Sequence, residues 1–383
     1  MIEAVAYLRL VTILGGYGIF GSRIASALAK HPNTRVRIVG RDARGGVIFA
    51  DRIGAEFRSG DLRHTESLRR AIEGSFIVIH TAGPFQGKDY RVAELCLGSG
   101  SHYLDIADAR DFVTGIGALD NAARRAGVFV SSGVSSLPAI TDAMISELQS
   151  AFHSIDEIQI ALSPGNQNPR GASTIGAILT YIGRPLRVQQ NGQWIMRPGW
   201  GDARWFEFPE PVGRRRVHNC DVPDLDLFPE AWGARTVRFG AGVELNIMNY
   251  TLSGIARLRK LLALENLQRY APLVLRLSLL LYPFGSKNGS LAVWLRGAAL
   301  DGAPLQRKIA IVTDNDGPAT PCSPAIVLAI RILDHGPPCA GAFPCRGFVT
   351  LGELTTHLSR FGVWIARGDQ HGWEPAISER SES

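Results

Sequence analysis

The 383-residue sequence is poor in cysteine and contains no C-x-x-C pair. Its five cysteines are an odd number, which argues against a disulfide framework, so we expect reduced thiols and a cytoplasmic protein. The N-terminus carries Glu3 where a signal peptide would carry positive charge, so we predict no export signal. Histidine and cysteine residues near the C-terminus lack the spacing of zinc ligands, so we predict no metal site.

Charge and hydropathy exclude further classes. The net charge of +6 is modest, and no alternation of aromatic and basic residues indicates a nucleic-acid surface. The most hydrophobic segment, Ala271 to Phe284, is interrupted by Arg276 and is too short to cross a bilayer. A buried or interfacial amphipathic helix is the preferred interpretation of this segment, and peripheral membrane contact stays open.

A glycine cluster follows an apolar, β-branched run near the N-terminus. Gly16, Gly18 and Gly21 form G-x-G-x-x-G directly after the predicted strand 11–14 and directly before a helical pattern. In this context Gly16 permits the turn, Gly18 lets a pyrophosphate approach the backbone, and Gly21 lets the helix pack on the strand. The free N–H groups at the start of the helix would then bind the phosphates. The predicted cofactor-binding residues of this turn are Gly15, Gly16, Tyr17, Gly18, Ile19, Phe20 and Gly21.

The end of the second predicted strand indicates which dinucleotide binds. NAD-binding chains place an acidic residue there, whereas this sequence has Arg41, which can pair with a 2′-phosphate. We therefore predict NADP as the cofactor, with NAD as the second choice and FAD ranked lower, and Arg44 as a second phosphate contact. The alternative is that Arg41 is solvated and that Asp42 binds the ribose.

Six short predicted strands alternate with helices over the first 130 residues, which is typical of a doubly wound parallel sheet. Asp61 follows the third strand and is a candidate for the adenine site, or equally for a helix N-terminus. The fourth strand opens into residues expected beside the nicotinamide: Ala82, Gly83, Pro84 and Phe85.

Beyond Pro138 the pattern changes to helices mixed with alternating strands, which predicts a second α+β domain with a mixed or antiparallel sheet. We predict an NADP-binding domain over 1–138 and a substrate or dimerisation domain over 139–323. A segment over 324–367 is expected to pack back on the first domain, and 368–383 is expected to be a flexible tail.

Four stretches resemble the saccharopine dehydrogenase family, namely 82–87, 100–113, 132–138 and 341–347. The run H-Y-L-D-I-A-D-A-R at 102–110 is the most specific of them. The similarity is strong over about residues 10–145 and looser up to about 360. The resemblance implies an NAD(P)-dependent oxidoreductase fold. In the lysine-pathway and carboxyspermidine-forming members, hydride passes to or from the carbon of an imine formed between an amine and an aldehyde.

The predicted catalytic residues come at or just after the fifth strand: Asp105, Tyr103 and Asp108. Asp105 ends that strand and is the first choice for binding or protonating a substrate amine. The alternatives are that Asp105 and Asp108 cap the following helix and that Tyr103 is core packing.

Two functions remain. The first is an NADP-dependent oxidoreductase acting on an imine or carbonyl of a small polar metabolite. The second is a non-catalytic NADP-binding redox sensor or scaffold. The expected partner is a small-molecule substrate, and the family resemblance implies a homodimer.

Overall fold

The computed structural model describes residues 8–374. The chain forms two compact units, and each is built from several segments. Unit 1 contains residues up to Ala143 together with Pro169–Ala177 and Pro318–His357. Unit 2 contains Met144–Asn168, Ile178–Gly317 and the chain from Leu358 onward.

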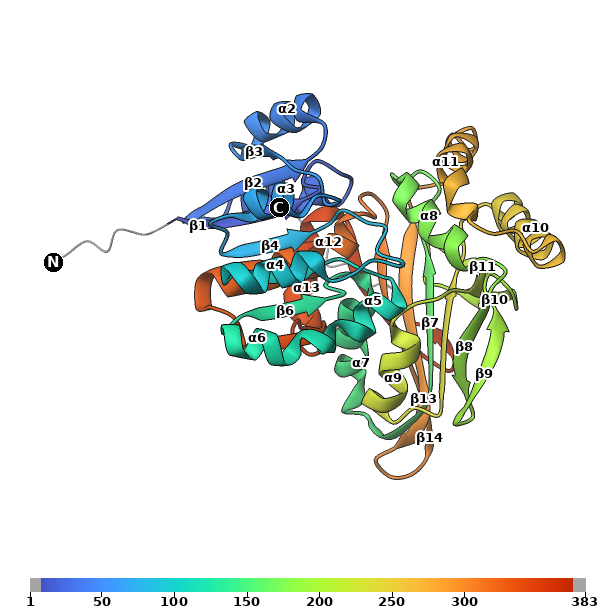
Figure 1. Cartoon of the computed structure of the whole chain (residues 1–383). Helices are drawn as coiled ribbons and strands as arrows, with labels where there is room; N and C mark the ends of the chain where they lie inside the picture. The colour runs from blue at the N-terminus through green and yellow to red at the C-terminus, as the bar shows by residue number, and fades with distance from the viewer. Residues whose placement is uncertain (1–7, 375–383) are drawn as a thin grey trace, which may run out of the picture. The chain divides into compact units, whose positions relative to one another are not determined.

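Unit 1 is built on a seven-stranded sheet in the order β15-β6-β5-β4-β1-β2-β3, in which every pairing is parallel (Figure 1). Because the strand order reverses between β1 and β4, the carboxyl ends of these two strands flank the switch point where doubly wound sheets bind ligands. The strands are β1 (Arg9–Leu14), β2 (Thr34–Gly40), β3 (Glu56–Ser59), β4 (Ile77–His80), β5 (His102–Asp105), β6 (Phe129–Ser132) and β15 (Gly341–Pro344).

Helices cover both faces of this sheet, as right-handed crossovers require. In β1, Val11, Ile13 and Leu14 are fully buried, and so are Ile77 and Ile79 in β4, because apolar runs suit strands covered on both sides. The helices are α1 (Gly21–Leu28), α2 (Ala43–Ile53), α3 (Thr65–Ile72), α4 (Arg91–Ser99), α5 (Arg110–Thr114), η1 (Gly115–Leu119), α6 (Asp120–Ala126), η2 (Ser136–Ile140), α12 (Ala319–His335) and α13 (Leu351–Leu358).

The doubly wound parallel sheet is confirmed, with two differences in detail. The sheet has a seventh strand, β15, which comes from the C-terminal part of the chain and pairs with β6. The sequence pattern predicts one helix over 112–126, whereas the structure divides this segment into α5, η1 and α6, with two glycines, Gly115 and Gly117, in the 3-10 segment.

Unit 2 is built on a mixed eight-stranded sheet in the order β10-β11-β12-β7-β13-β14-β16-β17. The β12–β7 pairing is parallel and the other pairings are antiparallel. A separate hairpin pairs β8 with β9. The strands are β7 (Phe152–Ser163), β8 (Pro185–Gln190), β9 (Gln193–Pro198), β10 (Arg204–Glu207), β11 (Arg214–Asn219), β12 (Thr236–Ala241), β13 (Gly289–Ala299), β14 (Pro304–Thr313), β16 (Val363–Asp369) and β17 (Gly372–Trp373).

The chain passes from unit 1 to unit 2 within two helices. The boundary falls at 143–144 in α7 (Thr141–Gln149) and at 177–178 in α8 (Ala172–Tyr181). The remaining helices of unit 2 are α9 (Asp224–Trp232), α10 (Asn246–Leu262), η3 (Leu267–Tyr270), α11 (Ala271–Leu279) and η4 (Ser359–Phe361). Within residues 8–374 no helix is both long enough and apolar enough to cross a membrane.

Two sequence expectations about these elements need correction. The segment 324–367 does not belong as a whole to unit 1, because its last residues, from Val363, form β16 in the sheet of unit 2. Residues 368–374 are not a flexible tail, since β16 and β17 include most of them, whereas 375–383 lie outside the described residues. In segment 271–284, for which a buried or an interfacial helix was expected, Leu273, Leu277 and Phe284 are more than half exposed, which favours the interfacial alternative.

Candidate active site

The glycine turn between β1 and α1 is close-packed at three positions. Gly15 has φ +80°, so the residue that requires a left-handed backbone is Gly15 and not Gly16. A Cβ on Gly16 would lie 2.6 Å from the Cγ2 atom of Ile38. A Cβ on Gly21 would lie 2.2 Å from the carbonyl oxygen of Gly15. Gly18 is exposed and donates its N–H to the Gly15 oxygen at 2.9 Å.

Thr81 joins the ends of the two strands at the switch point. Its backbone N–H and its hydroxyl both donate to the carbonyl oxygen of Leu14, at 2.9 and 2.8 Å. A Cβ on Gly21 would also come within 2.7 Å of this hydroxyl oxygen. The turn therefore has one compact arrangement, with Gly18 on its open side, as a phosphate-binding turn requires.

Tyr17 connects the glycine turn to the end of β2. Its ring lies against Gly40, where a Cβ would approach the ring within 2.2 Å. Its hydroxyl oxygen accepts a hydrogen bond from the backbone N–H of Asp42 at 2.9 Å. Gly40 was not predicted as a site residue, and the signal that could have identified it is its position directly before Arg41 at a strand end.

The charged residues that follow β2 and β3 differ in exposure and in their partners. Arg41 and Arg44 are exposed. Asp42 is the N-cap of α2, since its side chain accepts the N–H of Arg44 at 3.1 Å. The acidic residue that is the alternative ribose ligand thus has a structural role through one of its two carboxylate oxygens. Asp61 does not cap α3, whose N-cap is His64; it pairs instead with Arg63 at 2.6 Å, which holds its pKa well below the usual range.

The segment after β4 is only partly open. Ala82 and Gly83 are half-buried, and Pro84 is exposed. The Phe85 ring is 4% exposed and packs on the rings of His80 and Phe112, with centroids 4.8 and 5.3 Å away. The carbonyl oxygen of Gly83 accepts a hydrogen bond from the Ser173 hydroxyl at 3.3 Å. Ser173, from α8, was not singled out in the sequence.

Asp105 is completely buried at the end of β5 and binds the loop that follows β6. Its Oδ1 atom accepts hydrogen bonds from the N–H of Gly133 and the hydroxyl of Ser132, both at 2.9 Å. The same atom accepts the N–H of Ala107 at 3.0 Å. The backbone oxygen of Asp105 accepts the N–H of Val134 at 2.7 Å. Asp105 thus organises two loops at the ligand edge of the sheet.

Two further polar side chains, those of Tyr103 and His80, are buried close to Asp105. Tyr103 is fully buried in the core cluster of the unit, and its hydroxyl lies 3.1 Å from Nδ1 of His80. Asp108 differs, because it is exposed and accepts a hydrogen bond from Nε2 of Gln86 at 3.3 Å. The N-cap of α5 is Ala109, without a side-chain cap, so neither aspartate caps that helix.

Burial sets the ionisation of these groups. It raises the pKa of Asp105 to about 6, although four hydrogen-bond donors, Gly133, Ala107, Ser132 and Tyr103, partly oppose the shift. It lowers the pKa of His80 to about 4, and raises the pKa of Tyr103 well above its usual value. A carboxyl group that titrates near pH 6 can exchange a proton under ordinary conditions.

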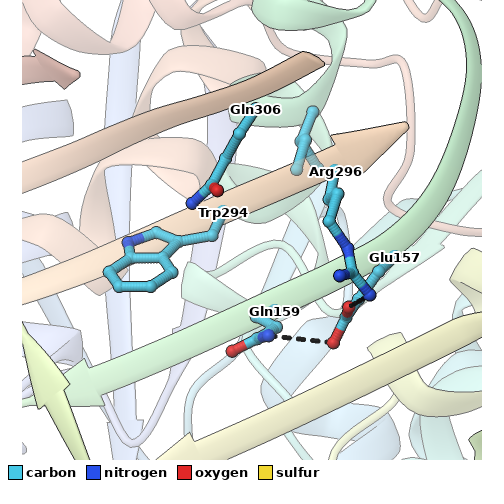
Figure 2. A pocket seen from close by; sticks show the side chains of 6 residues that line it. Glu157, Gln159, Trp294, Arg296 and Gln306 are labelled. Atoms are coloured by element: carbon cyan, nitrogen blue, oxygen red, sulfur yellow. Dashed lines mark hydrogen bonds and ion pairs between the residues drawn. The ribbon is translucent and has the colours of Figure 1, made fainter. Parts of the chain in front are cut away.

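A shallow pocket of about 190 Å³ lies elsewhere, on the sheet of unit 2. In Figure 2, Glu157 points toward Arg296 and Gln159, at 2.5 and 2.8 Å. These contacts satisfy the carboxylate, so the pocket shows no free reactive group. Within residues 8–374 no cluster of three or more histidine, cysteine, aspartate or glutamate side chains could hold a metal ion.

Comparison with known proteins gives one family match, in the first part of the chain. Residues 11–145 match the family model described as the saccharopine dehydrogenase NADP binding domain. No curated protein sequence matches the chain.

Two solved structures share the fold over nearly the whole chain. Apo saccharopine dehydrogenase (L-Glu forming) from Saccharomyces cerevisiae has a TM-score of 0.67 at 13% identity, covering 94% of this chain and 99% of that one. Homospermidine synthase from Legionella pneumophila, in complex with NAD, has a TM-score of 0.61 at 13% identity, covering 98% and 93%.

Proposed function

Since residues 11–145 belong to the NADP-binding domain family of saccharopine dehydrogenases, we propose that this protein is an NADP-dependent oxidoreductase. Its reaction is a hydride transfer to or from the imine or carbonyl carbon of a small polar metabolite. The observation that carries the proposal is the glycine turn, which is closed at Gly15 and Gly21 and open at Gly18, with Arg41 exposed at the end of β2.

The residues of unit 1 fit a dinucleotide phosphate. The N–H groups at the start of α1 suit the pyrophosphate, and Arg41 with Arg44 suits the 2′-phosphate. Asp42, the acidic residue at the β2 end, uses one carboxylate oxygen to cap α2. Asp61 is proposed near the adenine, and Ala82, Gly83, Pro84 and Phe85 are proposed beside the nicotinamide. When bound, NADPH would supply the hydride, and residues 82–85 would help to hold the reacting carbon close to the nicotinamide.

Within this site Asp105 is a positioning residue and the first candidate for proton exchange. Its hydrogen bonds to Ser132, Gly133 and Ala107 fix the loops after β5 and β6. Asp108, which is exposed, is the second candidate for contact with substrate. Tyr103 acts on the substrate only through its neighbours, because it is fully buried against His80.

One observation favours the second function, a non-catalytic NADP-binding sensor. Tyr103 and Asp105 are both 0% exposed, so each has a sufficient structural role without touching a substrate.

Titration with NADPH and NADH tests the proposal, followed by a screen for hydride consumption with aldehyde–amine pairs. The emission of NADPH itself is the signal to follow, because the seven tryptophans all lie in unit 2. NADPH binding with turnover of at least one pair supports the oxidoreductase. Binding without turnover across the screen favours the sensor, and no binding of either nucleotide contradicts both functions.

A further inference from the structure

Two helices of unit 2, α10 and α11, present large apolar side chains to solvent. They are drawn in yellow-orange in Figure 1. We call the surface formed by six of these side chains the outer face; they are Ile247, Tyr250, Leu261, Leu273, Leu277 and Phe284. Their exposed fractions run from 54% for Leu273 to 80% for Leu261. An exposed apolar patch of this kind usually marks an interaction site.

In α10 the apolar side is turned outward. Ile247, Tyr250 and Leu261 have helical spacing and lie on one stripe, together with Leu258, which is 47% exposed. Asn249, Ala256 and Arg259 lie on the opposite side of the helix and are buried. A helix that packed on its own domain in the usual way would bury leucines and expose the arginine.

Hydrogen bonds on the inner side fix this orientation. The Arg259 guanidinium donates to the carbonyl oxygens of Leu179, Thr180 and Ile182, at 3.0, 3.1 and 2.9 Å. The Asn249 side chain donates to the oxygen of Val243 at 2.8 Å and accepts its N–H at 3.1 Å. Rotating α10 to bury its leucines would break all of these bonds, so the outward stripe is a stable feature of the fold.

The exposed charges of the outer face are mainly basic. Glu265 is the one acidic residue of segment 246–287. Arg257, Arg269 and Arg276 are exposed beside the leucines. Glu244, which precedes the segment, is already paired with Arg215 at 3.2 Å.

We propose that the outer face docks on an anionic lipid surface. Leucines, an isoleucine, a tyrosine and a phenylalanine flanked by arginines are the composition of helices that lie in a membrane interface. A second copy of the chain is disfavoured as the occupant, because a two-fold interface would bring these arginines together with only Glu265 to pair with them.

Co-sedimentation with lipid vesicles tests this docking. Phosphatidylcholine vesicles are compared with vesicles that also contain about one third phosphatidylserine, at low and high salt. The variants are the double substitution Leu261→Ser and Leu277→Ser, and the control Leu300→Ser. Leu300 is equally exposed, at 74%, but lies in the turn between β13 and β14. Tryptophan emission verifies that each variant folds.

The wild type and Leu300→Ser should bind the anionic vesicles, and the double variant should bind about tenfold more weakly. High salt should weaken binding of the wild type, because exposed arginines contribute to it. Absence of vesicle binding, or equal binding of the double variant, overturns the proposal. A dimer that the double substitution dissociates, without vesicle binding, would assign the face to a second copy instead and overturn the proposal as well.

Discussion

The Oδ1 atom of Asp105 lies 2.9 Å from the backbone nitrogen of Gly133 and accepts its hydrogen bond. Gly133 has φ +78°, and a Cβ there would lie 2.5 Å from the Cδ atom of Pro138. The loop after β6 is thus fixed by a buried carboxyl group and by a position that only glycine can occupy.

The first prediction concerns the pH dependence of folding. Because burial raises the pKa of Asp105 from 3.8 to about 6, the folded protein keeps a proton that the unfolded chain releases in that range. The contribution of Asp105 to stability therefore falls as pH rises from about 4 to 6, by on the order of 3 kcal/mol, and is constant above pH 6. Asp105→Asn keeps the Oδ1 acceptor without the charge, so its stability relative to wild type should rise over this range.

Urea unfolding followed by far-UV circular dichroism at several pH values measures this difference. Tryptophan emission, recorded in parallel, reports on unit 2 alone. Asp51→Asn, at an exposed position of α2, is the matched control and should change stability by less than about 0.5 kcal/mol. A stability difference for Asp105→Asn that does not vary with pH would contradict the assignment.

His80 should show the opposite dependence. Its pKa is lowered by burial to about 4, so the unfolded chain binds a proton between about pH 6.5 and 4 that the folded protein does not. The contribution of His80 is therefore lost as the pH falls through this range. His80→Gln should flatten the loss of stability on the acid side, measured by the same unfolding experiment. An unchanged acid limb would show that His80 is protonated in the folded state.

Gly21→Ala should destabilise unit 1. The added Cβ would meet the Gly15 oxygen at 2.2 Å, and overpacking of this kind costs about 1–3 kcal/mol. Gly98→Ala is the control, since Gly98 lies in α4 with nothing within 4 Å of an added Cβ, and should be neutral or stabilising by up to about 1 kcal/mol. Equal effects of the two substitutions on the circular-dichroism unfolding transition would argue against close packing of the turn.

Arg259→Met should destabilise unit 2. It leaves the carbonyl oxygens at the end of α8 without their donor, at an expected cost of about 2–4 kcal/mol. Arg257→Met, two residues earlier and exposed, should change stability by less than about 0.5 kcal/mol. Tryptophan emission during urea unfolding measures both, and a loss of under 0.5 kcal/mol for Arg259→Met would show that water replaces the guanidinium.

The sheet of unit 1 could be predicted because its signals are local. The run Ile77–His80 is apolar and buried on both faces, and the glycines after Leu14 stand between a strand and a helix. Strand β15 could not be predicted as a member of this sheet, because nothing in Gly341–Pro344 shows which edge it pairs with.

In unit 2, strand β11 was missed because its charges hide its alternation. Arg215 and Val217 are buried, while Arg214 is exposed and Arg216 half-buried, so the three consecutive arginines point to both sides of the sheet. Helix α9 was missed because Pro229 interrupts its pattern. The periodicity of α10 could be recognised, but sequence alone does not reveal that its apolar side faces outward.

In the candidate site, the glycine turn follows from spacing, whereas the contacts that close it do not. Tyr17 of this turn contacts Gly40 and Asp42 at the end of β2, and Ser173 of α8, far away in the sequence, donates to the carbonyl oxygen of Gly83. Burial is likewise a property of the folded chain: Tyr103 and Asp108 were predicted as equals, yet one is in the core and the other is exposed.

The most direct test of the cofactor assignment is the ratio of NADH to NADPH dissociation constants, compared between wild type and Arg41→Glu. Arg125→Glu is the charge-matched control, because Arg125 is exposed in α6, the helix that precedes β6, and β6 is separated from β2 by three strands of the sheet. The wild type and the control should prefer NADPH. Arg41→Glu should weaken NADPH binding by about 2–3 kcal/mol, or roughly 30- to 150-fold, and leave NADH binding nearly unchanged. Equal weakening of both nucleotides, or no change in either, would contradict the assignment of Arg41 to the 2′-phosphate.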